Sequence, residues 1–410
     1  MDNDNKTIWI INQYASHLET RHLELAKVFA QSGYSVVVIT TSFHHGKREY
    51  IYDEKMKTVQ RSENVNYVYL HSAPGYQTNG VGRILNMIDF CRLVFRYKKQ
   101  IAREFGIPGY IIASSAPPFV WEVAYKLAKK YHAKFVAELR DIWPLSLVEI
   151  QGVNPKHPLV KLFDIIEKRA YKRADAIVTT MRYAWKHICG INENYKDKVH
   201  WMANGINTKQ ADEWLEEYKE LPPDLDEFLS EHWCCVYVGS IVRSECVDYL
   251  VEAISGLADE GVYFAVIGQG HEKQNIQSMI ERNQIKNVRM FPFLERKYIP
   301  TVLNKAKCCV AAYKTIGTGR YGMSMYKLSD YLYSGTPTVF AFDLANVVAD
   351  AGHFAIPFGD ADRLRETILS IKNTDDGVLM ELSEKGKEEI RKHYDYENIG
   401  KSYLEVLNHC

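Results

Sequence analysis

The chain has 410 residues, more than one hydrophobic core usually serves, so we expect two domains of about 200 residues each. Its 51 basic and 51 acidic residues balance, which excludes a global positive field of the kind that draws proteins to nucleic acid. The eight cysteines form no C-x-x-C pair and mostly lie in apolar runs. This pattern favours reduced thiols in a cytoplasmic protein over disulfides or a zinc site.

Two further features of the sequence bear on where the protein works. The first residues are polar and acidic, so we expect no signal peptide. No uninterrupted apolar run reaches about 20 residues, so we expect no membrane-spanning helix. We therefore predict a cytoplasmic protein, and leave open a peripheral position at the inner face of the cell membrane.

Strand and helix patterns alternate along the chain. In the first half, apolar strand-like runs and helical patterns follow one another at 8–11, 19–31, 36–39, 110–113, 120–131, 133–137, 159–173, 176–180 and 199–202. After a polar stretch the alternation starts afresh at 234–238, 247–258, 263–267, 272–282, 288–291, 298–306 and 308–312. Continuous apolar strands separated by helices predict parallel sheets that are covered on both faces.

We therefore predict an α/β fold with two doubly wound, Rossmann-like domains. The first covers residues 1–207 and the second residues 208–394. Residues 395–410 form a final helix with no strand after it. This helix either caps its own domain or crosses back to the first, and the sequence leaves both open.

The loops after the strands of the second half carry glycines and cations. Ligands of open parallel sheets bind at the carboxyl ends of the strands, where Gly239, Gly268 and Arg243 are expected. Lys327 and Asp330 follow on one face of a predicted helix. An ammonium group suits phosphate and a carboxylate suits ribose hydroxyls, so this pattern predicts a nucleotide diphosphate site. Neither a dinucleotide-binding G-x-G-x-x-G nor a P-loop motif occurs where it would be needed.

Several segments in this order resemble the retaining glycosyltransferases of family 4, in particular the bacterial branch that makes capsule, O-antigen and other surface polysaccharides. The resemblance rests on residues 20–26 with 33–40, Glu138-Leu-Arg-Asp-Ile-Trp-Pro144, Asn204-Gly-Ile206, 237–240, 266–270 and Tyr326-Lys-Leu-Ser-Asp-Tyr through Val339. It implies the GT-B fold, in which two Rossmann-like domains face each other across a cleft.

The resemblance also implies roles for individual residues. Asp330 holds the ribose, while Lys327 and Arg243 bind the pyrophosphate. The backbone at Gly239 and Gly268 completes the donor site. Backbone groups around Phe293 and Leu294 hold the base, and those of Ser324 and Met325 lie at the pyrophosphate or sugar. Asp141 and Glu138 are the catalytic candidates on the acceptor side. No covalent nucleophile, metal or other cofactor is expected.

Three places depart from the family pattern. Gly322 stands where a glutamate usually contacts the donor sugar, Tyr14-Ala15 replaces the usual Gly-Gly after the first strand, and Arg140-Asp141 replaces a frequent histidine. Whether Asp141 acts chemically or braces its loop stays open.

A basic helical pattern between Arg83 and Glu104 predicts a surface for a lipid-linked acceptor or anionic membrane. Its apolar stripe is Ile84, Ile88, Cys91 and Phe95. The cations assigned to this acceptor or membrane side are Arg21, Arg92, Arg96, Lys99 and Arg103, and the loop 74–80 lies nearby in sequence. The alternative is a helix packed on the sheet with solvated cations, because Met87 and Val94 widen the apolar face.

The predicted function is transfer of a hexose-type sugar from a UDP- or GDP-linked donor to a glycan acceptor that is lipid-linked. A nucleotide-sugar epimerase of the same fold is the first alternative. A non-catalytic nucleotide-sugar-binding component of a polysaccharide assembly complex is the second.

Overall fold

The computed structural model of the chain describes residues 5–15, 20–314, 317–342 and 352–410. The chain divides into two compact units. Unit 1 contains Met1–Ala203, Gly317–Met323 and Tyr396–Cys410, and unit 2 contains Asn204–Ile316 and Ser324–Asp395. None of the described helices is long and apolar enough to cross a lipid bilayer.

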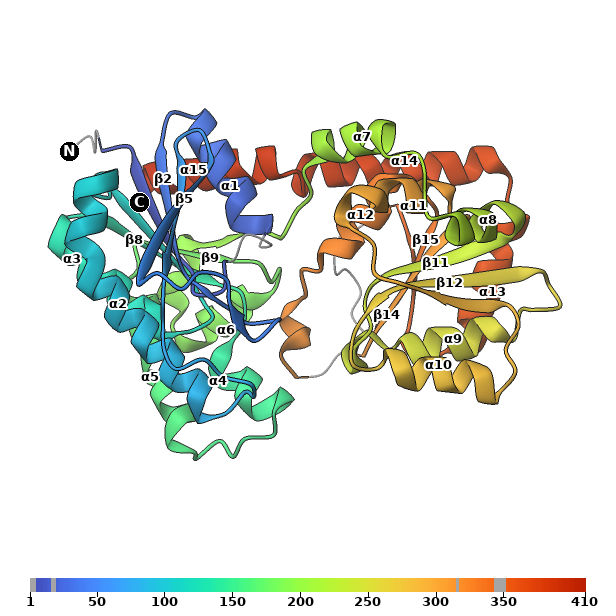
Figure 1. Cartoon of the computed structure of the whole chain (residues 1–410), viewed down its shortest axis with the longest axis horizontal. Coiled ribbons are helices and arrows are strands. Elements are labelled where there is room, and N and C mark those ends of the chain that lie inside the picture. Colours follow the sequence, from blue (N-terminus) through green and yellow to red (C-terminus); the bar gives the residue numbers. More distant parts are fainter. Residues whose placement is uncertain (1–4, 16–19, 315–316, 343–351) are drawn as a thin grey trace. The chain divides into compact units, whose positions relative to one another are not determined.

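Unit 1 is built on an eight-stranded sheet in the order β10-β9-β8-β7-β1-β2-β6-β5 (Figure 1). All neighbouring strands are parallel except β5, which runs antiparallel to β6. The strands are β1 (Thr7–Ile11), β2 (Ser35–Thr41), β5 (Met56–Ser62), β6 (Val65–Leu70), β7 (Tyr110–Ser114), β8 (Lys134–Leu139), β9 (Ala176–Thr179) and β10 (Val199–Trp201). A small hairpin of β3 (Phe43–His44) and β4 (Glu49–Tyr50) follows β2. The central strands are buried along their whole length because helices cover both faces of the sheet.

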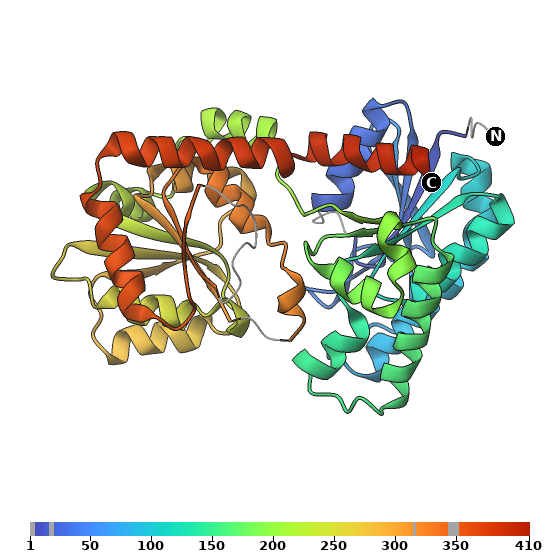
Figure 2. The same ribbon diagram turned by 180° about the vertical axis from the view of Figure 1, so that it is seen from behind.

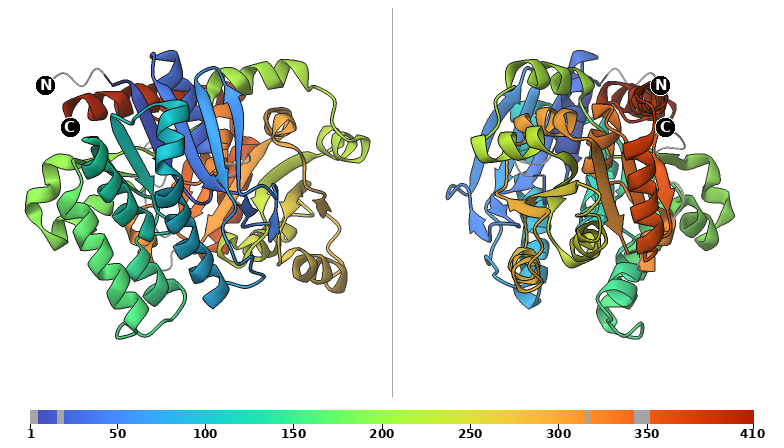
Figure 3. Two further views of the ribbon diagram at one scale, coloured as in Figure 1. Left: turned by 60° about the vertical axis from the view of Figure 1, so that its left-hand side comes forward. Right: turned by 90° about the vertical axis from the view of Figure 1, so that its right-hand side faces the viewer.

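The helices of unit 1 lie on the two faces of this sheet. Figure 3 shows α2 (Val81–Phe105), α3 (Phe119–Tyr131) and α5 (Pro158–Arg173) side by side, with α3 in contact with both others. α1 (Thr20–Gln31) packs against α15 (Tyr396–His409), as Figure 2 shows from behind. The remaining helices are α4 (Trp143–Leu145) and α6 (Ala184–Ile191). The main core lies between the sheet and the α2, α3 and α5 layer, and Phe90, Trp121 and Phe163 are almost fully buried in it.

Unit 2 contains a six-stranded, entirely parallel sheet in the order β13-β12-β11-β14-β15-β16. Its strands are β11 (Trp233–Ser240), β12 (Val262–Gln269), β13 (Val288–Phe291), β14 (Cys308–Tyr313), β15 (Thr338–Phe342) and β16 (Phe354–Ile356). Its helices are α7 (Thr208–Glu217), α8 (Pro223–Glu231), α9 (Val247–Ser255), α10 (Lys273–Arg282), α11 (Ile299–Lys305), α12 (Tyr326–Ser334), α13 (Ala361–Asn373) and α14 (Asp376–His393). α9, α10 and α13 share one core with the sheet.

This architecture confirms the predicted α/β fold with two Rossmann-like sheets. The structure places the division between the units at Ala203 and Asn204, four residues before the predicted boundary at 207. The backbone explains the shift, because Ile206 donates its N–H to Tyr394 O of unit 2 at 2.9 Å. Two segments also return to unit 1, namely Gly317–Met323 and α15, whose Tyr403 ring meets Phe29 of α1 edge to face at 5.6 Å.

Candidate functional site

Unit 2 gathers charged side chains at the carboxyl edge of its sheet. A short 3-10 turn, η3 (Arg243–Glu245), follows β11, and α12 begins nearby at Tyr326. Lys327 Nζ donates to Tyr237 Oη at 2.8 Å and forms an ion pair with Glu245. The side chains of Lys327 and Glu245 are each 12% exposed. The ammonium that is predicted to bind phosphate is thus paired with a carboxylate in this structure.

The surroundings of Lys327 act on its charge in opposite directions. Burial lowers the pKa of Lys327, and Glu245 opposes this shift. A Cβ atom on Gly239 would lie 2.9 Å from Lys327 Nζ, so a larger residue here would require the lysine side chain to shift away from the end of β11. The same mostly buried environment would strengthen the attraction between the ammonium and a phosphate.

Asp330 lies one turn further along α12 and has its own cationic partner. Arg296 Nη2 donates to Asp330 Oδ1 at 3.0 Å, and the Asp330 side chain is 14% exposed. Burial raises the pKa of Asp330, whereas Arg296 lowers it. Arg296 therefore fixes one carboxylate oxygen, and the role of Asp330 toward a ribose stays a prediction.

The other donor-side candidates differ in exposure. Arg243 and Phe293 are exposed, with 69% of Phe293 accessible, while Leu294 and Met325 are half-buried. Ser324 is fixed by Asn204, whose backbone N–H donates to Ser324 Oγ at 2.6 Å and whose Nδ2 donates to Ser324 O at 2.7 Å. An exposed aromatic ring and an exposed guanidinium are suited to a base and a phosphate, respectively.

The glycines at the end of β12, Gly268 in the strand and Gly270 just after it, have a packing explanation. A Cβ atom on Gly268 would lie 1.9 Å from Gly239 O, and one on Gly270 would lie 1.9 Å from Ile241 O. Because these distances are far below contact, only glycine fits where the two strand ends run side by side. Gly268 is also buried, so its direct contact with a donor stays a prediction.

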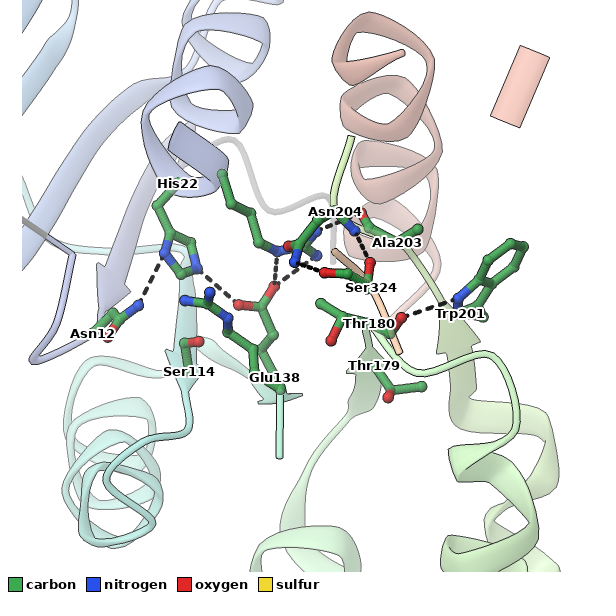
Figure 4. Close-up of polar contacts among 12 residues, drawn as sticks. Asn12, His22, Ser114, Glu138, Thr179, Thr180, Trp201, Ala203, Asn204 and Ser324 are labelled. Carbon is green, nitrogen blue, oxygen red and sulfur yellow. Dashed lines mark hydrogen bonds and ion pairs between the residues drawn. The ribbon is translucent and has the colours of Figure 1, made fainter. Parts of the chain in front are cut away.

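Unit 1 contains a buried ionic cluster that joins α1 to the end of β8 (Figure 4). Arg21 donates to Glu138 Oε2 from Nε at 3.2 Å and from Nη2 at 3.0 Å, and from Nη1 to Ala203 O at 2.6 Å. His22 Nε2 lies 2.7 Å from Glu138 Oε1, and Asn12 Nδ2 lies 3.1 Å from His22 Nδ1. An ionised carboxylate only accepts, so the proton on this side of the ring is at Nε2 and Nδ1 accepts from Asn12.

The cluster corrects the predictions for Glu138 and Arg21. Both side chains are fully buried, so neither is open to an acceptor or a membrane. Burial raises the pKa of Glu138, but Arg21 and His22 together bring it well below the usual carboxyl range. Glu138 is therefore a positioning residue here. Asp141 is exposed three residues later, so it stays the catalytic candidate of this loop.

The backbone explains why the glutamate expected at position 322 is missing. Gly322 has φ of 97°, and a Cβ atom there would lie 3.0 Å from the backbone nitrogen of Arg182. The preceding turn η5 (Gly317–Tyr321) is held to the rest of unit 1, because Arg320 forms a bidentate ion pair with Glu149 at 2.7 and 2.9 Å. Only glycine suits this left-handed position.

α2 packs on the sheet through Met87, Phe90, Val94 and Ile101. The predicted apolar stripe is therefore wrong in part: Cys91 is buried, whereas Ile88 is 48% and Phe95 is 42% exposed. The outward face of α2 carries exposed apolar and basic side chains together, namely Val81, Leu85, Ile88, Arg92, Phe95, Arg96, Lys99 and Arg103.

The described residues contain no group of three or more His, Cys, Asp or Glu side chains able to hold a metal ion. Two acidic triplets of the D-x-D type occur at residues 224–226 and 360–362. In the first, Asp226 pairs with Lys305, and in the second, Asp360 caps α13 by accepting from Arg363 N at 3.0 Å.

Sequence reasoning missed several partners that define these sites. Glu245 and Tyr237 hold Lys327, Arg296 holds Asp330, and His22 holds Glu138. A signal existed for two of them, because Glu245 follows Arg243 in one loop and His22 follows Arg21. Arg296 lies 34 residues before Asp330, and no local pattern connects them.

Two protein-family models match the chain in succession. The model described as Glycosyltransferase Family 4 matches residues 18–210, and the model described as Glycosyl transferases group 1 matches residues 234–373. The putative colanic acid biosynthesis glycosyl transferase WcaI of Escherichia coli K12 is 28% identical over 79 residues, which are 19% of each protein. The matching segment thus spans about a fifth of the length of this curated relative.

Solved structures share the fold over nearly the whole chain. Anabaena Alr3699/HepE in complex with UDP-glucose has a TM-score of 0.67 at 12% identity, covering 98% of this chain and 100% of that one. A UDP-forming α,α-trehalose-phosphate synthase from Burkholderia xenovorans has a TM-score of 0.72 at 12% identity, covering 98% of both chains. These likenesses establish the GT-B fold.

Proposed function

Because the two family models and the shared fold make this chain a glycosyltransferase of the GT-B type, we propose that it transfers a hexose-type sugar from a UDP- or GDP-linked donor to a glycan acceptor. The observation that carries the donor assignment is the Lys327–Glu245 pair at the carboxyl edge of the second sheet, with Arg243 exposed in the same loop. The HepE structure, which contains UDP-glucose, supports a nucleotide-sugar donor.

The chemistry follows from charge. Breaking the sugar–phosphate bond leaves negative charge on the nucleotide diphosphate, and positioned cations stabilise that charge in the transition state. Lys327 and Arg243 supply these cations, and the diphosphate takes the place of Glu245 at Lys327. Metal independence is part of the proposal, since the protein's own cations serve the phosphates. Retention of anomeric configuration is proposed from the resemblance to retaining enzymes.

The acceptor is proposed to be a lipid-linked glycan in the synthesis of a bacterial surface polysaccharide. The similarity to a putative colanic acid biosynthesis glycosyl transferase supports this pathway class. The layer formed by α2, α3 and α5 supports a membrane contact, because basic residues outnumber acidic ones in all three helices. Apolar side chains lie exposed in the same layer, including Ile88 and Phe95 on α2 and Leu162 on α5. Cations beside exposed apolar groups suit an anionic lipid surface.

The test is incubation of the purified protein with UDP- and GDP-linked sugars, without and with a lipid-linked acceptor. Slow release of free sugar, and transfer when the acceptor is present, would support the transferase. Formation of an epimer would favour the epimerase. Binding without turnover would favour a non-catalytic binding protein, the candidate to which Gly322 lends weight because it removes one donor-sugar contact.

A further inference from the structure

A second cationic cluster lies at the carboxyl edge of the sheet of unit 1. Its members come from the loops after β1, β3 and β6 and from the first turns of α2 and α4: Tyr14, His45, Arg48, Tyr76, Arg83 and Trp143. Arg83 Nε donates to Tyr14 Oη at 3.1 Å, and its guanidinium carbon lies 5.5 Å from the centre of the Tyr14 ring and 5.6 Å from that of Trp143. Arg48 lies 5.1 Å above the Tyr76 ring. Aromatic rings thus hold both guanidinium groups in place.

His45 lies beside Arg48 and beside Tyr14, the residue to which Arg83 donates, and its imidazole is neutral. Arg48 Nη1 lies 3.0 Å and Tyr76 Oη lies 2.7 Å from His45 Nδ1. A guanidinium only donates, so His45 Nδ1 carries a lone pair and no proton. Burial lowers the pKa of His45 to about 4, and Arg83 and Arg48 act in the same direction. The two arginines therefore leave the cluster with a positive charge that His45 does not increase.

Within the described part of the chain, neither Arg48 nor Arg83 forms an ion pair. The carboxylate of Asp141 lies near enough for Arg83 to act toward lowering its pKa, but it forms no ion pair with either arginine. Arg83 lies in the first turn of α2, where the helix dipole disfavours a cation, and that turn has no acidic residue. Gly80 at the helix start provides no side-chain cap. Two like charges beside a positive helix end cost stability, so the arrangement calls for an anion.

We propose that Arg48 and Arg83 bind a phosphate group of the acceptor, as in a prenyl diphosphate that carries the glycan. The inference rests on the proposed transferase function for naming the acceptor as the ligand. Guanidinium groups bind phosphate oxygens through paired N–H donors. Arg48 and Arg83 are both half-buried, so both remain accessible from solvent. Because the rings already restrain both side chains, binding loses little side-chain entropy.

The experiment measures binding of farnesyl diphosphate, inorganic pyrophosphate and farnesol to the full chain by calorimetry. UDP is kept at saturation so that the donor site is occupied. The variants are Arg48→Gln and Arg83→Gln, with Arg83→Lys as a charge-conserving companion. Arg61→Gln is the matched control, since Arg61 also rests on two tyrosine rings, Tyr67 at 5.8 Å and Tyr69 at 5.7 Å, but lies on the edge strand β5.

We expect each glutamine variant to bind farnesyl diphosphate about 10- to 100-fold more weakly, because each loses one charged hydrogen bond. The Arg61→Gln control should bind it with the affinity of the wild type. Pyrophosphate binding with the same arginine dependence would support a phosphate site to which the prenyl chain adds nothing. Equal affinity in folded wild type and glutamine variants, or farnesol binding as tight as that of the diphosphate, would overturn the proposal. Affinity for UDP and for GDP serves as a separate readout: if the chain binds neither nucleotide while the arginine dependence holds, the transferase proposal fails and the phosphate site stands.

Discussion

Replacing Lys327 by alanine tests the donor site most directly. The ammonium is mostly buried, and a nucleotide diphosphate would take the place of Glu245 beside it. Losing a charged hydrogen bond costs about 1.5–3 kcal/mol, so Lys327→Ala should weaken UDP or GDP binding by about 10- to 150-fold in calorimetry. Glu245→Gln should have the opposite effect, because it removes the anion that competes with phosphate for the ammonium.

The control is Lys307→Ala, which removes an exposed lysine immediately before β14, at the amino edge of the same sheet. It should bind nucleotide like the wild type. Unchanged affinity of a folded Lys327→Ala variant would refute the argument that this lysine binds phosphate. Weaker binding by Glu245→Gln would show that Glu245 supports the ligand and does not compete with it.

Four further outcomes follow from the structure. Neutralising the basic residues on the outward face of α2 should release the protein from anionic vesicles in a cosedimentation assay, at about 1 kcal/mol for each cation, and equal sedimentation of the variant and wild type would disprove membrane contact. The cations to be replaced are Arg92, Arg96, Lys99 and Arg103. Sugar transfer should survive EDTA, and loss of turnover with rescue by magnesium or manganese would contradict metal independence. Gly322→Ala should lower the free energy of unfolding by about 1–2 kcal/mol, measured by denaturant titration, because its φ of 97° is unfavourable for alanine. Glu138→Ala should lower it by about 3–5 kcal/mol by leaving Arg21 buried without a counter-charge. Because the pKa of Glu138 is lowered on folding, its stabilisation should be present above the usual carboxyl pKa and be lost as the pH falls below it, a dependence that the alanine variant should lack.

The sequence predicted the two sheets because their strands are continuous apolar runs. β1 and β7 are buried at every residue, and such runs are readable without a structure. β5, β6 and β16 were not predicted. None of the β5 residues is buried and its polar sequence resembles a loop, β16 has only three residues, and β6 is mostly buried but has Asn66 within its apolar run. The prediction of the division between the units was only approximate, because one segment of unit 1 has no recognisable pattern of its own. Gly317–Met323 contains no strand or long helix, so nothing local indicates that it packs with unit 1.

Partners distant in sequence limited the prediction of the site. Lys327 and Asp330 could be placed on one helical face because that spacing is local. Glu245 is 82 residues from Lys327, and Glu138 is 117 residues from Arg21, so the ion pairs depend on how the strands are ordered. The error at Arg21 arose here: an arginine early in a helix resembles a surface cation until its buried carboxylate is known.

The three charged clusters differ in how completely the protein satisfies them, and this difference separates structural from ligand-binding roles. At Glu138 both carboxylate oxygens are engaged and the side chain is fully enclosed, so a ligand has no access and the cluster fixes α1 to β8. At Lys327 the counter-charge is one carboxylate with partial access to solvent, and our proposal is that a diphosphate replaces it. At Arg48 and Arg83 the described residues provide rings and neutral hydrogen-bond acceptors, and no described carboxylate, Asp141 included, forms an ion pair with either guanidinium. A cation held in place without an anion is the arrangement that gains most from binding one, since the positioning cost is already met by folding.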